Sequence, residues 1–254
     1  GSSAVTPMPP PPPPPSPPPS NPFPDTIAEP EQFETREYNA TVGLPIIGAS
    51  AAYALGATGQ GQTVAVIDTG TDSDHPDLQG AVVQMFDVCA DTTCAGFNAA
   101  GDRVTITRQD GDIDTEGHGT LVTGVIAARR QDDFSSVLDD NTPNGIQGAA
   151  YEASIIDIRA DSPGSCARTG EDEGCAYNDD TLVRAIEYAV AQGASIINMS
   201  LGGEIDNDPR LENAVRAAAA AGCRRGRGRP EWHSVGLFEQ GRQCGAELLP
   251  ARTR

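Results

Sequence analysis

One stretch decides the fold class of this chain: Val64-Ala65-Val66-Ile67-Asp68-Thr69-Gly70. Its apolar half has the near-continuous hydrophobic pattern of a parallel strand that is buried on both faces. The run ends in Asp68, and parallel sheets place their functional sites beyond the carboxyl ends of their strands. We therefore expect a carboxylate at the working edge of an α/β sheet.

A second motif, Gly117-His118-Gly119-Thr120, precedes an apolar stretch that we expect to form a helix over 120–129. A lone histidine is more often structural than catalytic. Here the flanking glycines allow an imidazole at the helix start to approach both a carboxylate and a serine. Asp68 alone is also compatible with a ribose or metal site, but the nearby glycines precede the strand, whereas a nucleotide loop follows one.

Strands and helices are expected to alternate along the body of the chain. The expected strands are 63–68, 81–86, 153–159 and 194–198, and the expected helices are 46–56, 120–129, 180–192 and 210–221. The acidic stretch from Phe86 to Glu116 lacks a clear period. This alternation predicts a doubly wound parallel α/β sheet flanked by helices and incomplete at its carboxyl end.

With Asn198-Met199-Ser200-Leu201-Gly202-Gly203, the two motifs resemble the subtilisin-like serine proteases, and all three occur in that family's chain order. The resemblance covers 38–222. It implies a serine endopeptidase in which Asp68 orients His118, and His118 acts as general base and then general acid. It also implies that Ser200, Leu201 and Gly202 bind the substrate backbone as an added β-strand.

The family's third catalytic residue has no counterpart in this sequence. The family places an Ala-Gly-Asn strand end and then a Gly-Thr-Ser turn after this region, but the only serine after Ser200 is Ser234, in a His-Ser-Val context. We expect the amino-terminal two thirds of a peptidase domain, inactive as written. The alternatives are a pseudo-protease that binds extended peptides without cleaving them, and a basic-tailed binding module.

The pattern of buried elements stops at Gly222. Four arginines fall within 224–229, and a buried parallel strand cannot accommodate them. Arg and Gly codons of GC-rich DNA, read one base later, encode residues such as Val, Ala and Gly. We therefore interpret 223–254 as the product of a frameshift or similar lesion, in preference to a nucleic-acid-binding arm, and expect this tail to be disordered.

Proline dominates the amino-terminal region, where 13 of the 21 prolines lie within 1–24. A polyproline tract forms an extended, semi-rigid spacer. We therefore expect a disordered linker over 1–37, a partial peptidase domain over 38–222 and the aberrant tail over 223–254. The linker would hold the domain away from a cell surface; the alternative, a docking ligand for aromatic grooves, lacks a flanking basic residue.

Charge and cysteine spacing indicate the compartment. The net charge of −19 argues against nucleic-acid partners. No stretch is apolar over the ~18 residues of a membrane span. Two close pairs, Cys89 with Cys94 and Cys166 with Cys175, predict local disulfides in an exported protein. A zinc site is less favoured, because the pairs lack two-residue spacing and a nearby histidine.

These features predict a bacterial-type protease outside the cell or on its surface. We expect a monomer that acts on proteins or peptides and needs no cofactor. Asp77, within Asp74-His75-Pro76-Asp77-Leu78, matches a calcium ligand of some family members, and an oxygen-rich loop contains Asp139, Asp140, Asn141 and Asn144. A solvated acidic loop is the favoured interpretation, because no ligand spacing is decisive.

Overall fold

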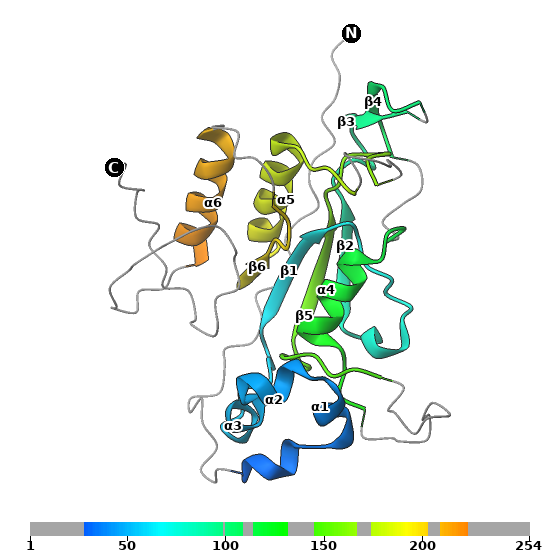
Figure 1. Ribbon diagram of the computed structural model, residues 1–254. Coiled ribbons are helices and arrows are strands. Elements are labelled where there is room, and N and C mark those ends of the chain that lie inside the picture. The colour runs from blue at the N-terminus through cyan, green and yellow to red at the C-terminus, as the bar shows by residue number, and fades with distance from the viewer. Residues whose placement is uncertain are drawn as a thin grey trace, which may run out of the picture.

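The computed structural model describes residues 28–98, 100–108, 114–131, 145–166, 174–202 and 209–222. Its helices are η1 (Pro30–Phe33), α1 (Arg36–Ala40), α2 (Gly43–Ile47), α3 (Ala49–Ala54), η2 (Pro76–Leu78), α4 (His118–Ala127), α5 (Asp179–Ala191) and α6 (Pro209–Gly222). Its strands are β1 (Thr63–Asp68), β2 (Val82–Asp87), β3 (Cys94–Phe97), β4 (Arg103–Ile106), β5 (Ser154–Arg159) and β6 (Ile196–Asn198). Figure 1 shows the sheet between the helices, with the β3–β4 hairpin at one end and α1 to α3 at the other.

Four parallel strands form the central sheet in the order β2-β5-β1-β6. Strand β1 is interior, and it pairs with β5 from Thr63 opposite Ser154 to Asp68 opposite Arg159. Asp68 therefore lies at the carboxyl edge of the sheet, as the apolar run predicted. The expected α/β class with a parallel, helix-flanked sheet is confirmed.

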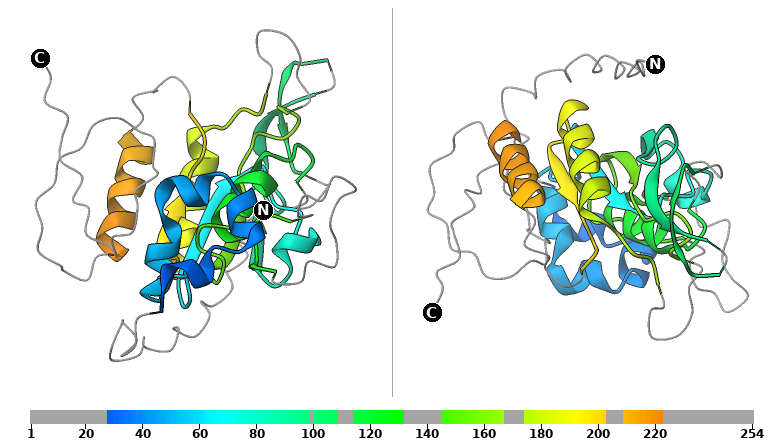
Figure 2. Two further views of the ribbon diagram at one scale, coloured as in Figure 1. Left: turned by 60° about the horizontal axis from the view of Figure 1, so that its bottom comes forward. Right: turned by 90° about the horizontal axis from the view of Figure 1, so that it is seen from above.

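Side chains of β1 alternate between two hydrophobic cores. Ala65 and Ile67 pack into the core beneath α5 and α6, and Val64 and Val66 pack into the core beneath α4. Figure 2 shows this arrangement, with α4 on one face of the sheet and α5 and α6 on the other. Burial on both faces explains why β1 is almost entirely apolar up to Asp68.

A third core lies at the end of the sheet remote from Asp68. There Tyr38, Leu44 and Tyr53 of α1 to α3 pack with Tyr151. The single helix expected over 46–56 is wrong, because Gly48 adopts a left-handed conformation with φ of 64° and separates α2 from α3. Only glycine takes this conformation without a steric cost.

The remaining expected elements are present with small shifts at their ends. Helix α4 begins at His118, two residues before the expected start. The stretch from Phe86 to Glu116, which lacked a sequence period, contains the antiparallel β3–β4 hairpin, with Cys94 opposite Ile106. Small and polar residues such as Gly96 and Thr105 make up much of this hairpin, so its alternation was weak.

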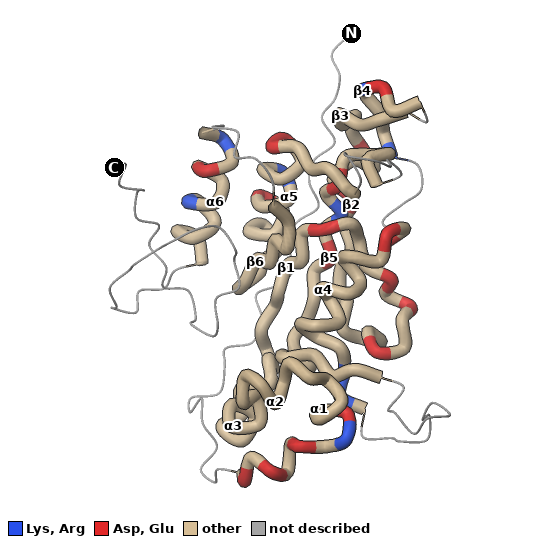
Figure 3. Tube along the Cα trace, viewed as in Figure 1, with Lys and Arg blue, Asp and Glu red and all other residues tan. Residues whose placement is uncertain are grey.

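Both expected disulfides are present, Cys89–Cys94 and Cys166–Cys175. Acidic residues are more frequent than arginines along the described chain (Figure 3). No helix in the described ranges combines the length and the apolar character needed to cross a bilayer. Part of the disordered linker expected over 1–37 is ordered, because η1 occupies Pro30–Phe33 and α1 begins at Arg36, with Glu37 buried. Residues 1–27 and the tail 223–254, for which disorder was also expected, lie outside the described ranges.

Candidate active site

Asp68 and His118 meet at the carboxyl edge of the sheet. Nδ1 of the imidazole lies 2.7 Å from Oδ1 of the carboxylate, so the contact expected from the two motifs is confirmed. The Asp68 side chain is fully buried, whereas the His118 side chain is 49% exposed. Since an ionised carboxylate only accepts hydrogen bonds, the proton of this contact belongs to Nδ1, which leaves Nε2 to act as a base.

Close packing brings the start of α4 onto the end of β1. A Cβ atom on Gly119 would lie 2.1 Å from the carbonyl oxygen of Gly70, so no larger residue fits there. The Gly119 amide donates to the Thr69 hydroxyl at 2.9 Å. These contacts explain why glycine follows His118, and they place the imidazole beside the carboxylate.

Asp114 anchors the same junction, although it belongs to none of the three sequence motifs. Its carboxylate accepts hydrogen bonds from the Thr69 hydroxyl, from the amides of Glu116, Gly117 and Thr120, and from the Thr120 hydroxyl. Burial alone would raise the pKa of Asp114, but these hydrogen bonds outweigh it and lower the pKa below its usual value. The sequence signal for Asp114 was an acidic residue four positions before His118.

We expect Asp114→Ala to destabilise the chain by about 1 to 2 kcal/mol, because the amides at the start of α4 lose their acceptor. A carboxyl group with a lowered folded pKa stabilises above its unfolded pKa and loses that effect as the pH falls through the folded value. In urea unfolding, the difference in unfolding free energy between the unmodified chain and Asp114→Ala should therefore shrink below about pH 4. As a control, Asp91→Ala on an exposed side chain should change stability by less than about 0.5 kcal/mol. An equal loss at pH 3 and pH 6 for Asp114→Ala would contradict the role of the ionised carboxylate as the acceptor.

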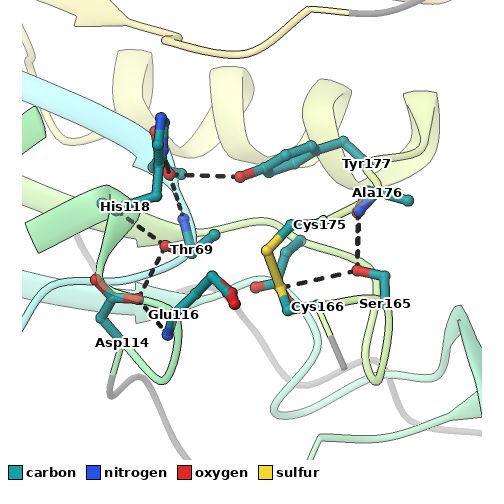
Figure 4. Close-up of a disulfide and its surroundings, with 12 residues drawn as sticks. Thr69, Asp114, Glu116, His118, Ser165, Cys166, Cys175, Ala176 and Tyr177 are labelled. Carbon is teal, nitrogen blue, oxygen red and sulfur yellow. Dashed lines mark hydrogen bonds and ion pairs between the residues drawn. A yellow bond between two sulfur atoms is a disulfide. The ribbon is translucent and has the colours of Figure 1, made fainter. Parts of the chain in front are cut away.

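The two oxygens of Asp68 have different surroundings. Oδ1 accepts hydrogen bonds from His118, from the Thr69 amide at 2.8 Å and from the Tyr177 hydroxyl at 3.4 Å. Oδ2 is buried, with no hydrogen-bond partner among the described residues. Figure 4 shows His118, Thr69 and Tyr177 close together, with Asp114 joined to Thr69.

Ser200, Leu201 and Gly202 follow β6 at the same edge of the sheet. Strand β6 runs parallel to β1 with Asn198 opposite Val66, so the chain leaves the sheet close to the level of Asp68. The Asn198 amide donates to the Ser200 hydroxyl at 2.9 Å. Ser200 and Gly202 are exposed.

Four buried charged side chains border the pair on the β5 side. Asp161 accepts from Arg108 Nη1 at 3.0 Å and from Arg159 Nε at 3.1 Å, and Arg108 Nε lies 2.9 Å from Asp87. Their side chains are only 2 to 4% exposed. Arg159 lies opposite both Asp68 and Asp87 in the sheet register, so the cluster continues the row of residues that begins with Asp68.

Two other groups are relevant to metal binding. Asp77 accepts hydrogen bonds from the Gln131 side chain and the Ile146 amide, and Glu37 accepts one from the Gln131 amide. Both carboxylates are buried. The oxygen-rich loop containing Asp139, Asp140, Asn141 and Asn144 lies outside the described residues.

Glu116 forms the second group with the sulfur atoms of Cys166 and Cys175, all within 4.8 Å of one another. Because the two sulfurs are bonded to each other, they are not thiolate ligands.

Comparison with known proteins identifies the family of this chain. The model of the subtilase family matches residues 59–229, which include both motifs and all four parallel strands. The chain belongs to the subtilase family. The resemblance inferred from the three sequence motifs is therefore confirmed.

Individual relatives are serine proteases. The Major intracellular serine protease of Bacillus subtilis (strain 168) is 34% identical over 180 residues, which cover 71% of this chain and 46% of that protein. Thermitase from Thermoactinomyces vulgaris is 34% identical over 187 residues, or 73% of this chain and 51% of that protein. This subtilase chain thus spans about half the length of these two relatives.

Other relatives are named as extracellular or cell wall-associated proteases. Among solved structures, fervidolysin from Fervidobacterium pennivorans aligns with 80% of this chain and 27% of its own, at 22% identity and a TM-score of 0.47.

Proposed function

We propose that this subtilase sequence encodes the Asp and His part of a serine endopeptidase. The observation that carries the proposal is the 2.7 Å contact between a fully buried Asp68 and a half-exposed His118. Burial keeps competing water from the carboxylate, and exposure leaves Nε2 accessible to a nucleophile. A histidine with only a structural role does not need this combination.

In this mechanism His118 Nε2 removes the proton from a serine hydroxyl as the oxygen attacks the scissile carbonyl carbon. Asp68 stabilises the imidazolium that forms, through the hydrogen bond at Nδ1. His118 then gives the proton to the leaving amine as the C–N bond breaks, and water repeats the cycle on the acyl-enzyme. Ser200 to Gly202 hold the substrate backbone beside the pair as an added strand.

The nucleophile and the oxyanion side chain would come from sequence that follows Gly222 in the correct reading frame. Two features of the described chain support this. Strand β6 lies at the edge of the described sheet with Ile196 50% exposed, and α6 buries only Ala214 among its residues. A further parallel strand after α6 would cover that edge, and the arginines of 224–229 cannot form it.

The experiment begins with the nucleotide sequence from codon 215 onward. If one inserted or deleted base restores an Ala-Gly-Asn strand and a Gly-Thr-Ser turn, the corrected protein should hydrolyse peptides and lose that activity with a serine-directed sulfonyl fluoride. The 254-residue chain should show no hydrolysis. A corrected protein that carries the serine and cleaves nothing would contradict the proposal.

The second candidate is a pseudo-protease, which the exposed Ser200 and Gly202 at the sheet edge that carries Asp68 support. A genomic sequence that confirms the tail and its stop codon would select this candidate. The chain should then bind extended peptides along Ser200 to Gly202 without cleaving them.

We further propose that the protein acts outside the cell as a monomer, on protein or peptide substrates, held from the surface by its Pro-rich segment. Two disulfides in the described structure support an oxidising compartment. The buried carboxylates of Glu37 and Asp77 supply oxygen atoms, the type of ligand that calcium prefers, so their chemistry is compatible with a structural calcium ion.

A further inference from the structure

Tyr177 touches the buried carboxylate of the Asp–His pair from the side of α5. Its hydroxyl donates to Asp68 Oδ1 at 3.4 Å, and its ring packs against the core beneath α5. Burial raises the pKa of Tyr177 far above its usual range, and the negative charges of Asp68 and Asp161 raise it further. The hydroxyl therefore stays protonated at physiological pH and remains a donor.

The backbone around Tyr177 is fixed on both sides. Cys175 is joined to Cys166 by a disulfide, and Tyr177 forms an antiparallel bridge with Asp161. On the other side, Asn178 caps α5 by accepting a hydrogen bond from the Thr181 amide.

Ala176, next to Tyr177, adds two more constraints. Its carbonyl accepts from the Ser162 amide at 2.7 Å, and its amide donates to Ser165 Oγ at 3.0 Å. Figure 4 shows the disulfide, Ser165 and Ala176 leading to the tyrosine.

Three donors share one oxygen of Asp68, and they do not act alike. His118 and Thr69 lie at 2.7 and 2.8 Å, whereas Tyr177 is a longer contact that comes from a separate segment, two residues after the Cys166–Cys175 disulfide. A hydroxyl that donates to a carboxylate withdraws negative charge from it and weakens it as an acceptor for other donors. The Tyr177 hydroxyl therefore competes with His118 for Oδ1 and limits the strength of the Asp68–His118 hydrogen bond.

We propose that Tyr177 is a positioning residue for Asp68 and that the Cys166–Cys175 disulfide holds its hydroxyl in place. The proposal rests on the proposed function in that the Asp68–His118 pair is taken as the catalytic pair. Its test does not need peptidase activity, so the two can fail separately.

The test uses the Nδ1–H proton of His118, whose NMR chemical shift reports the strength of its hydrogen bond to Asp68. In the full 254-residue chain, Tyr177→Phe should move this resonance downfield, because Oδ1 loses a competing donor while the ring volume is retained. The charged groups around the pair, namely Asp68, Asp114, Glu116, Arg159 and Asp161, stay unchanged in this variant. The chain has three histidines, so His75→Gln and His233→Gln complete the assignment.

Tyr188→Phe is the matched control. Tyr188 lies on α5, and its hydroxyl accepts from the Gln84 side chain of β2 and does not touch Asp68. It should leave the His118 resonance in place. An unchanged or upfield resonance in Tyr177→Phe would overturn the proposal, since a tyrosine that only supports the fold would loosen the pair when altered.

The role of the disulfide is tested with the double variant Cys166→Ser/Cys175→Ser, which should move the resonance in the same direction as Tyr177→Phe. Combining all three substitutions should add nothing further, because both changes remove the same contact. The control Cys89→Ser/Cys94→Ser opens the other disulfide and should have no effect. Additive shifts would overturn the role of the disulfide, and if the double variant fails to fold, Tyr177→Phe alone decides the role of the tyrosine.

Discussion

We expect Asp68→Asn to lower kcat of the frame-corrected peptidase by about 10⁴-fold. The substitution preserves the size of the side chain but replaces an acceptor with an amide, whose NH₂ group favours the wrong imidazole tautomer. Nε2 of His118 would then carry the proton and could not accept one from the nucleophile. The measurement is steady-state hydrolysis of a peptide substrate.

His118→Ala should produce a loss of at least the same size, because it removes the base itself. The double variant should be no worse than His118→Ala alone, since the two residues act as a unit. Asp74→Asn is the matched control: it makes the same chemical change on an exposed side chain six residues further along and should leave kcat unchanged. Independent, multiplying losses for Asp68 and His118 would contradict the shared role.

The sequence predicted the parts of this structure that depend on local pattern. Strand β1 was evident because both of its faces are buried, which makes four successive residues apolar before Asp68. His118 was evident because position 119 lies so close to Gly70 that only glycine fits there, and this glycine is part of the motif around the histidine. The two disulfides followed from short spacing within loops.

Contacts between distant side chains were not predictable in the same way. Tyr177 reaches Asp68 across 109 positions, and Arg108 reaches Asp161 across 53. Neither residue belongs to a motif, and both fall in acidic segments that lack a secondary-structure period. Their partners are set by the order β2-β5-β1-β6, which brings the ends of separate strands together.

The buried cluster of Asp87, Arg108, Arg159 and Asp161 leads to the second large effect. We expect Arg108→Met to destabilise the chain by about 3 to 5 kcal/mol, because it leaves two buried carboxylates with one guanidinium. Methionine keeps much of the apolar volume of arginine, so the loss would reflect charge more than packing. Urea unfolding followed by circular dichroism measures it.

Arg216→Met supplies the matched control. Arg216 pairs with Glu212 on α6, four residues away, with side chains 40% and 63% exposed. Solvent screens this pair, so its loss should change stability by less than about 0.5 kcal/mol. A similar loss for both arginines would mean that burial of the cluster does not matter.

The pH dependence separates charge from packing in Arg108→Met. Burial already raises the pKa of Asp87 above its usual value, although the Cys89 amide, Arg108 and Arg159 favour the ionised form. Removing Arg108 should raise it further. A carboxyl group with a raised folded pKa destabilises the native state increasingly as the pH rises from its unfolded pKa to its folded one.

The loss in Arg108→Met should therefore be smaller at pH 4 than at pH 7, since protonation of Asp87 relieves the unpaired charge. Adding Asp87→Asn should recover part of the stability at pH 7 and little at pH 4, because asparagine is neutral at both and its side-chain oxygen can still accept from the Cys89 amide, as Asp87 Oδ1 does. A loss that is independent of pH and unrelieved by Asp87→Asn would show that Arg108 stabilises the sheet edge by packing alone.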